Sequence, residues 1–484
     1  KFCNGTRLTV ADSGMLEALG LAESPIVFTP IEDDTAGGDT NMDGNLSLPR
    51  YGTYQVGGAG SIQFNDWTEL RYLTSTHTGT LVASEIWTGN TLHHVTGNLA
   101  IPNGLTLRIL PGAIVKINNQ LSITVAAGGS LLAHGSLAQP IVVTSIRDDG
   151  HGGDTNDDGA ATTPAPGDWK EIRNNGGTVS LSHTRMVYGG WAQFSNQGDG
   201  MIRNTSSGSL TIDSCELAGS LLRIVAVDSG AVTIQNSILR DGRWAVTGNA
   251  SLVNCVVYGC ETGLSGSGTA VNSSITHCHG TMISGFTVQY CNLWNPPGMG
   301  QQTFPQTGTN GNISADPKYQ GAEAGLFMPR FGSPLIDAAD GTRAPELDAR
   351  GAPRVDDPHM PDTGIAAANG AFPDIGAYEV ATGARAEFDL VVRRVSGPAS
   401  ASIGDTVRVE WDTANTTGTR TAQGPWRDAV ALRSDDPTLG DQEIPLGDVL
   451  VQASLRPGDV QTFSATFTVP PLAEGRWRFQ ATTN

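Results

Sequence analysis

Two short acidic loops offer the clearest candidate functional residues in this sequence. Each loop fits the pattern D-x-N-x-D-G and follows a pair of adjacent aspartates. Oxygen atoms at alternate positions converge when the backbone curls, and the glycine permits the sharp turn. Calcium takes about six to eight oxygen ligands, so both loops predict structural Ca2+ sites. The predicted ligands are Asp33, Asp34, Asp39, Asn41 and Asp43 in the first loop, and Asp148, Asp149, Asp154, Asn156 and Asp158 in the second.

Both loops depart from an EF-hand at the position where a bidentate glutamate would close the site. That position holds Arg50 in the first loop and Ala165 in the second, and no helical pattern flanks either loop. The upstream aspartate pairs are expected to supply the missing carboxylates. The alternative is a hydrated Asx-turn loop that holds no ion. We expect calcium because the motif and its upstream pair occur twice.

Short β-strands are expected on both sides of these loops. Residues 105–169 alternate apolar and polar side chains in brief runs that single glycines separate, and no run has a helical period. Farther along, strand-like segments recur about every 20 residues, which predicts the turns of a parallel β-helix. The small residues expected at equivalent places in successive turns are Thr184, Cys215, Ser237, Cys255, Ser274 and Cys291. Asparagines beside them, at 236, 254 and 272, are expected to stack at a bend and bond the backbone of the next turn.

A long internal repeat indicates a second module of the same kind. The offset is 115 residues throughout, from Gly14 to Gly129 and from Asp33 to Asp148, and about 18 of the 31 residues from 14 to 44 are identical in the later copy. Residues 1–78 are therefore expected to be the end of a preceding β-helical module that carries its own acidic loop.

Composition narrows the class of protein. The 484 residues include 61 glycines, only 16% are charged, and the formal net charge is −19. Such a charge disfavours nucleic acid as a partner, because phosphates would repel it. No apolar run approaches the roughly 18 residues of a membrane span. None of the six cysteines forms a CxxC pair, so zinc is not expected. The chain begins with Lys1 and ends within a strand-like run, so we expect a piece of a longer polypeptide.

Changes in pattern divide the rest of the chain. Residues 79–320 are expected to form the β-helix, and residues 321–382 a loop-rich cap that covers its end. Residues 386–484 contain alternating strands at about ten-residue spacing, which predicts an Ig-like β-sandwich.

Charged residues near the predicted turns raise an enzymatic alternative. A lyase could use arginine or lysine as a base, and a hydrolase would need two carboxylates. The residues considered for these roles are Asp213, Glu216, Arg223, Asp228, Arg240, Asp241 and Arg243, with Trp244 as a sugar-stacking ring. They form no recognisable catalytic signature, and solvated turn residues are the simpler interpretation.

Two resemblances extend these predictions. Residues 79–380 resemble bacterial right-handed parallel β-helix repeat proteins, through IPNGLTLRILPGAIVKI, QPIVVTSIRDD, GGDTNDDG, GDW and the closing SPLID and DIGAYE segments. Residues 386–484 resemble the bacterial cell-adhesion-related domain called CARDB, through DLVV, GDTVRVEWDTAN, WRDAVALRSDD, LRPGDVQTFSATFTVP and EGRWRF. Proteins of this kind are exported and displayed on surfaces.

The resemblances and the residues together imply an all-β chain, a right-handed parallel β-helix followed by an Ig-like β-sandwich. The expected function is a secreted or cell-surface structural or adhesive protein, a rod stiffened by Ca2+ that could self-associate end to end into a filament or sheath. A polysaccharide or another cell-surface ligand is the expected partner, with no nucleic acid and no transmembrane segment. The alternative is a carbohydrate-active enzyme, a polysaccharide lyase or a glycoside hydrolase, because β-helices also include these classes.

Overall fold

The computed structural model describes most of the chain after residue 72 and short strands before it. The described residues are 6–10, 15–18, 26–28, 54–58, 61–64, 68–70, 73–89, 91–159, 161–191, 200–380, 390–416, 421–423, 426–434, 443–456, 458–472 and 475–483. The chain forms two compact units, Lys1–Val380 and Ala381–Asn484. Each is described separately.

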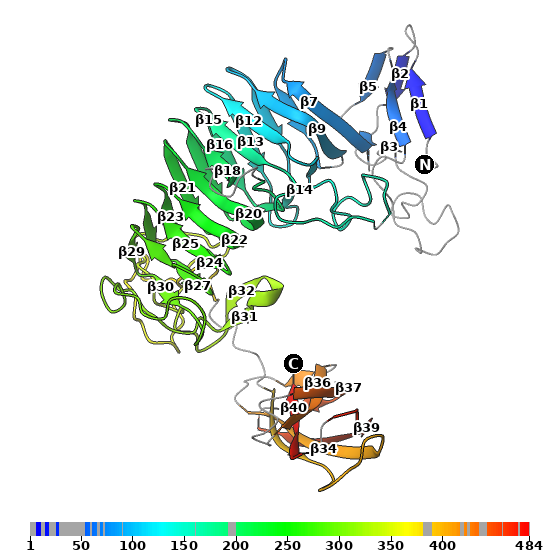
Figure 1. Ribbon diagram of the computed structural model, residues 1–484, viewed down its shortest axis with the longest axis vertical. Coiled ribbons are helices and arrows are strands. Elements are labelled where there is room, and N and C mark those ends of the chain that lie inside the picture. The colour runs from blue at the N-terminus through cyan, green and yellow to red at the C-terminus, as the bar shows by residue number, and fades with distance from the viewer. Residues whose placement is uncertain are drawn as a thin grey trace. The chain divides into compact units, whose positions relative to one another are not determined.

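The first unit is a parallel β-helix whose turns have three faces, here called A, B and C (Figure 1). Face B is a nine-stranded sheet, and faces A and C are the two parts of a fifteen-stranded sheet. Every strand pair in these two sheets is parallel. The all-β parallel β-helix predicted from the sequence is therefore confirmed.

The strands follow one another around the three faces. Face B contains β8 (Glu85–Trp87), β10 (Thr106–Ile109), β13 (Ser130–His134), β16 (Thr178–Ser182), β19 (Ser209–Asp213), β21 (Ala231–Gln235), β23 (Ser251–Val253), β26 (Thr269–Val271) and β29 (Thr287–Gln289). Face C contains β11 (Ile114–Ile117), β14 (Ile141–Ser145), β17 (Thr184–Val187), β24 (Val256–Tyr258), β27 (Ser274–Thr276) and β30 (Asn292–Trp294). Face A contains β12 (Ser122–Ala126), β15 (Glu171–Asn175), β18 (Gly200–Asn204), β25 (Thr262–Ser265) and β28 (Ile283–Ser284). Four longer strands bend from face C into face A, namely β7 (Leu73–Thr80), β9 (Thr91–Ile101), β20 (Glu216–Val227) and β22 (Ile238–Thr247).

Inward-pointing residues stack in register from turn to turn, which explains the repeating residue types. One buried column on face B is Ile109, Ala133, Leu181, Ile212, Ile234, Leu252, Ala270 and Val288. A second column, on face C, is Val115, Val143, Met186, Leu217, Leu239, Val257, Ile275 and Leu293. Burial of these columns is the main stabilising term of the fold.

Single residues in the left-handed conformation turn the chain from face B to face C. These residues are His183, Ser214, Asn236, Asn254, Asn272 and Tyr290, with φ between 44° and 53°. Asparagine tolerates this conformation better than most residues, which accounts for its recurrence. The buried small residue that follows is Ser273, not the predicted Ser274, because strand pairing aligns Ser274 with Val256 rather than with Cys255. Ser273 Oγ instead accepts a hydrogen bond from the Cys255 amide at 3.1 Å.

Three pairs of parallel strands belong to the first module. They are β1 (Thr6–Val10) with β4 (Tyr54–Gly58), β2 (Met15–Ala18) with β5 (Ser61–Phe64), and β3 (Ile26–Phe28) with β6 (Thr68–Leu70). In sequence, β2 and β3 correspond to β13 and β14 of the later copy. The internal repeat is thus also a repeat of structure, and the first acidic loop lies outside the described residues.

The last turn of the coil is covered by residues 295–316. The Asn295 side chain bonds the backbone of Cys278, Asn312 Oδ1 accepts from the Cys291 amide at 2.9 Å, and Phe304 joins the main core. Residues 317–380 then run back along face C and are here called the flank. The flank begins with β31 (Tyr319–Gly321), a 3-10 turn (Ala322–Ala324) and β32 (Leu326–Pro329). The segment expected as the cap, 321–382, is described as far as residue 380. Phe327 and Ala377 pack along face C on Ile238, Val256 and Tyr258, and Leu335 and Ile375 pack with Ile313 near the coil end.

The asparagine column connects the coil to the flank. Asn254 donates to the carbonyls of Asp374 and Gly376, and Asn272 donates to the Asp340 carbonyl and accepts from the Asp340 amide at 2.8 Å. Asn272 also donates to Asn254 Oδ1 at 3.1 Å. The predicted stack is present, but its backbone partners belong mostly to the flank rather than to the next turn.

The second unit is a β-sandwich of antiparallel sheets. One sheet contains β33 (Leu390–Ser396), β34 (Thr406–Asn415) and β39 (Val460–Thr468). The other contains β37 (Glu443–Val451), β36 (Trp426–Ser434) and β40 (Trp477–Thr483). A separate antiparallel pair is formed by β35 (Ala422–Gln423) and β38 (Ser454–Leu455). Trp411 is buried and donates to the buried carboxylate of Asp428 at 2.6 Å. In the described part of the chain, no helix is both long and apolar enough to cross a membrane.

Candidate metal centre

The second acidic loop leaves the coil between β14 and β15. Asp168 fastens its base, because this carboxylate accepts from Ser145 Oγ at 2.7 Å and pairs with Arg147 at 2.9 Å. Trp169 follows, fully buried, and donates its indole N–H to the Val187 carbonyl at 2.8 Å. The excursion is therefore anchored to the coil at the point where the chain returns to face A.

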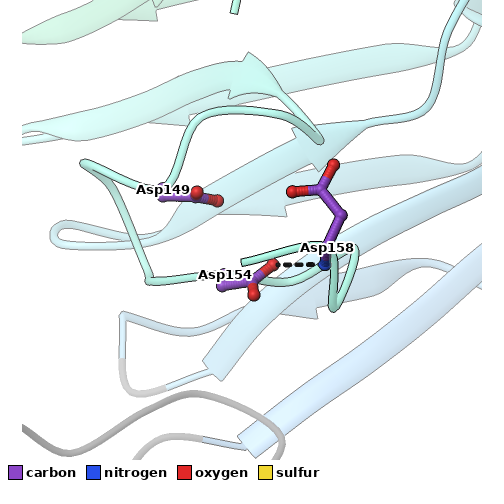
Figure 2. Close-up of side chains that lie close together, drawn as sticks. All are labelled: Asp149, Asp154 and Asp158. Atoms are coloured by element: carbon purple, nitrogen blue, oxygen red, sulfur yellow. Dashed lines mark hydrogen bonds between the residues drawn. The ribbon is translucent and has the colours of Figure 1, made fainter. Parts of the chain in front are cut away.

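The loop brings together three of the predicted calcium ligands. Carboxylate oxygens of Asp149, Asp154 and Asp158 all lie within 4.8 Å of one another (Figure 2). Asp154 accepts from the amide of Asp158 at 3.2 Å and from the amide of Gly159 at 2.8 Å, which closes the turn. Gly159 has φ of 70°, the left-handed conformation for which the motif places a glycine there.

Three oxygen atoms of this loop are buried and have no hydrogen-bond donor. They are Asp149 Oδ1, Asn156 Oδ1 and Asp158 Oδ1. Unsatisfied buried acceptors are costly in a folded protein, and a bound cation would satisfy them. All three belong to predicted ligands, so the residues present fit a hard cation such as Ca2+. Backbone carbonyls and water would complete the coordination of such an ion.

The electrostatics of the loop agree with this assignment. Burial, followed by the charge of Asp154, raises the pKa of Asp149 despite the opposing charge of Lys116. The pKa of Asp158 is lowered, chiefly by the hydrogen bond from Thr162. A divalent cation would offset the repulsion among these carboxylates.

Lys116 contacts the acidic loop from the coil, and the sequence predictions missed it. Its side chain is fully buried, and Nζ donates to the Gly153 carbonyl in the loop. Burial lowers the pKa of Lys116 to about 8, although Asp148, Asp149 and Asp154 oppose this shift. A lysine inside the apolar run Ile114–Ile117 is the signal that could have identified it.

The remaining predicted ligands have other positions. Asp148 accepts from Thr144 Oγ1 at 2.6 Å and from the Gly150 amide at 3.1 Å, and it pairs with His151 at 2.8 Å. Asn156 Nδ2 donates to Asp158 Oδ2 at 2.7 Å, while its own Oδ1 is one of the unpartnered atoms. Asp33, Asp34, Asp39, Asn41 and Asp43 lie outside the described residues, so their role remains a prediction.

The flank contains a second acidic cluster that the sequence analysis did not identify. Carboxylate oxygens of Asp337, Asp356 and Asp362 also lie within 4.8 Å of one another. Asp337 is 1% exposed, and burial raises its pKa to about 7. The spacing of these residues follows no motif, and they are brought together only by the path of the flank.

The charged residues considered for catalysis are engaged with one another. The Arg223 and Arg243 guanidinium groups lie 5.1 and 4.5 Å from the Trp244 ring, Arg240 pairs with Glu216 at 2.7 Å, and Arg203 pairs with Asp228 at 2.7 Å. Asp213 accepts from Ser214 and Gln235. Each of the charged side chains named here thus contacts an oppositely charged group, a polar side chain or an aromatic ring.

Comparison with known proteins adds little to this description. No family model and no curated protein matches the chain. Among solved structures, the chain is similar to the crystal structure of the enzymatically active domain of bacteriophage CBA120 tailspike protein 4, at 12% identity and a TM-score of 0.19. The match covers 81% of this chain and 61% of the tailspike chain. A likeness of this size carries no argument about function, so the fold assignment depends on the strand pairing described above.

Proposed function

We propose that the chain is a structural or adhesive part of an exported surface protein, a β-helical rod whose protruding loops are clamped by Ca2+. The observation that carries this proposal is the acidic loop with its three donor-less buried oxygens. The stacked coil supports the role of a stiff spacer, because each turn contacts only its neighbours and extends the structure along one axis. The β-sandwich that follows supports a display role.

The charged residues of the coil support a non-catalytic role over the enzymatic alternative. Arg240 pairs with both Glu216 and Asp241, and both Arg223 and Arg243 contact the Trp244 ring. A lyase base or a pair of hydrolytic carboxylates would need to face an open groove with its proton-transfer atoms free. Secretion, display and end-to-end association remain part of the proposal.

Calcium-dependent unfolding of the whole chain tests the clamp. A ligand that binds only the folded state, at 100 times its dissociation constant, adds about 2.7 kcal/mol. We therefore expect Ca2+ to raise the melting temperature of the β-helix by a few degrees over the value in EGTA. Mg2+ should have a smaller effect, because it requires tighter octahedral geometry.

Two substitutions in the same loop provide the matched comparison. Asp154→Asn should abolish most of the calcium-dependent shift, because it removes a central carboxylate charge. Asp157→Asn is the control, since Asp157 is exposed, does not belong to the cluster, and has φ of 58°, which asparagine tolerates. Equal calcium shifts in the two variants, or no shift in the unsubstituted chain, would contradict the proposal.

A further inference from the structure

Four strands of the second unit lie at the edges of its two three-stranded sheets. They are β33 and β39 in one sheet and β37 and β40 in the other. An edge strand presents unpaired backbone N–H and C=O groups, and folded proteins protect such strands with charged residues, proline or a bulge. Three of the four have this protection, through Arg393 and Arg394 in β33, Pro445 in β37 and Arg478 in β40. β33 and β37 also have a break in register with their neighbours.

The fourth edge strand, β39, has none of these features. It reads VQTFSATFT, without a charged residue, proline or glycine. Its pairing with β34 is unbroken from Val460, opposite Ala414, to Thr468, opposite Thr406. Within the part of the chain that the structure describes, β34 is the only strand that pairs with β39. Its other edge is therefore regular and uncharged, and a second strand could pair along it.

The two faces of β39 differ as expected for a strand of a sandwich. Phe463, Ala465 and Phe467 pack against the core of the second unit, and all three are only half-buried. Ser464 and Thr466 point the other way and are exposed. A strand added at this edge would cover more of the two phenylalanine rings, which favours its addition.

The sequence of β39 is nearly symmetric about Ala465, which makes the strand complementary to a second copy of itself. Two antiparallel copies with this residue opposite its counterpart would match each side chain with one of the same kind. Aromatic pairs and hydroxyl pairs across two strands stabilise antiparallel sheets. The matched pairs would be Phe463 with Phe467, Ser464 with Thr466, and Thr462 with Thr468.

The charge of the whole chain also limits where two copies can meet. A formal net charge of −19 opposes self-association over most surfaces. β39 contributes no charge to that repulsion.

We propose that two copies of the chain join through β39, antiparallel about Ala465, so that their two sheets continue as one. Such a two-fold contact uses the same patch on both copies and closes at the dimer. A foreign peptide could add to the same edge, but the symmetry of the strand favours a second copy. The biological meaning of the contact rests on the proposed structural role, whereas the contact itself requires neither Ca2+ nor a surface location.

Sedimentation velocity of the full chain over a series of concentrations tests the inference. We expect a reversible dimer. The double variant Ser464→Lys/Thr466→Lys should associate roughly tenfold more weakly or worse, because residue 464 of one copy faces residue 466 of the other and like charges then meet. The double variant Ser464→Glu/Thr466→Glu should be weakened in the same way. An equal mixture of the two variants should form a mixed dimer, because each lysine then faces a glutamate.

A matched control separates this contact from a general effect of charge. Gln480→Lys/Thr482→Lys adds the same two charges at outward positions of β40, an edge strand of the other sheet, and should dimerise like the unsubstituted chain. Melting curves identify any variant that fails to fold. Thr462→Lys/Thr468→Lys then decides, because these two residues also face each other in the proposed register.

Four outcomes would overturn the inference. They are a monomer at every concentration, a dimer that the β39 variants leave unchanged, a mixture of the lysine and glutamate variants that stays monomeric, and an equal loss in the β40 control. The chain with Asp154→Asn should dimerise like the unsubstituted chain, because the acidic loop belongs to the other unit. Failure of the calcium proposal and failure of this contact therefore give different results.

Discussion

At the scale of single residues, His93 makes the first turn of the coil sensitive to acid. Its ring is 3% exposed, stacks on Trp87 at 4.8 Å, and lies within 3.1 Å of both His77 Nε2 and the Thr88 carbonyl. Burial lowers the pKa of His93 to about 4, against an opposing effect of the Thr88 carbonyl. The neutral imidazole is therefore the form that the folded chain accommodates.

Acid should destabilise the folded chain through His93, because the unfolded chain binds the proton more readily. The unfolded chain binds a proton at His93 near pH 6.5 and the folded chain near pH 4, so stability is lost as the pH falls through this window. The loss amounts to about 3 kcal/mol. The free energy of unfolding, measured with denaturant, should differ less between pH 7 and pH 4.5 for His93→Gln than for the unsubstituted chain. An unchanged difference would contradict this assignment.

Asp337 in the flank should have the opposite pH dependence. Because its pKa is raised to about 7 in the folded state, its contribution to stability is present below the unfolded pKa and is lost as the pH rises through 7. In EGTA at pH 8, we expect Asp337→Asn to be more stable than the unsubstituted chain by about 2 to 4 kcal/mol. At pH 4 the difference should nearly vanish. If Asp337→Asn is less stable than the unsubstituted chain at pH 8, this prediction is wrong, because neighbouring groups then stabilise the Asp337 carboxylate in the folded state.

At the scale of elements, the asparagine column predicts how strongly the flank is held. Asn272 is buried, has φ of 53°, and exchanges two hydrogen bonds with Asp340. Asn272→Gly keeps the backbone conformation and removes the amide, so it should cost about 1 to 3 kcal/mol for the polar groups left unpaired. Asn272→Ala should cost more, because alanine is strained in the left-handed region.

Hydrogen exchange locates the effect of these substitutions. The Asp340 amide should exchange faster in both variants, because it donates to the Asn272 side-chain oxygen that both substitutions remove. The Gly376 amide donates to the backbone carbonyl of Asn272, so it should exchange faster only to the extent that the flank loosens. Amides in β10 and β13 should keep their protection. Uniform loss of protection over the whole coil would show that the flank and the coil unfold together.

The sequence predicted the coil well, because one physical constraint repeats in every turn. Inward positions such as Leu181, Ile212 and Ile234 must match the neighbours above and below, so the pattern is visible without a structure. The path of the flank could not be predicted, because contacts such as that between Asn254 and Asp374 join residues 120 positions apart and follow no period. Likewise the motif and its upstream aspartate pair predicted Asp149, Asp154 and Asp158 as candidate ligands, which the structure brings together, whereas Lys116 reaches this loop only through packing.

At the scale of the whole molecule, the two compact units should unfold separately. The β-helix and the β-sandwich have separate cores, the latter around Val409, Trp411 and Val430. Scanning calorimetry of the full chain should therefore show two transitions. Ca2+ should move only the transition of the unit that contains residues 1–380, because the described acidic cluster of the D-x-N-x-D-G loop lies there. A single transition, or an equal shift of both, would contradict the division.

The most direct test of the central claim is a crystal structure of the chain grown with CaCl2, with anomalous data. We predict an ion among Asp149, Asp154, Asn156 and Asp158, at oxygen distances of about 2.3 to 2.6 Å. The three oxygens that lack hydrogen-bond donors should be among its ligands. An ordered loop without an anomalous peak, in which water or the Lys116 ammonium contacts these oxygens instead, would contradict a calcium site here.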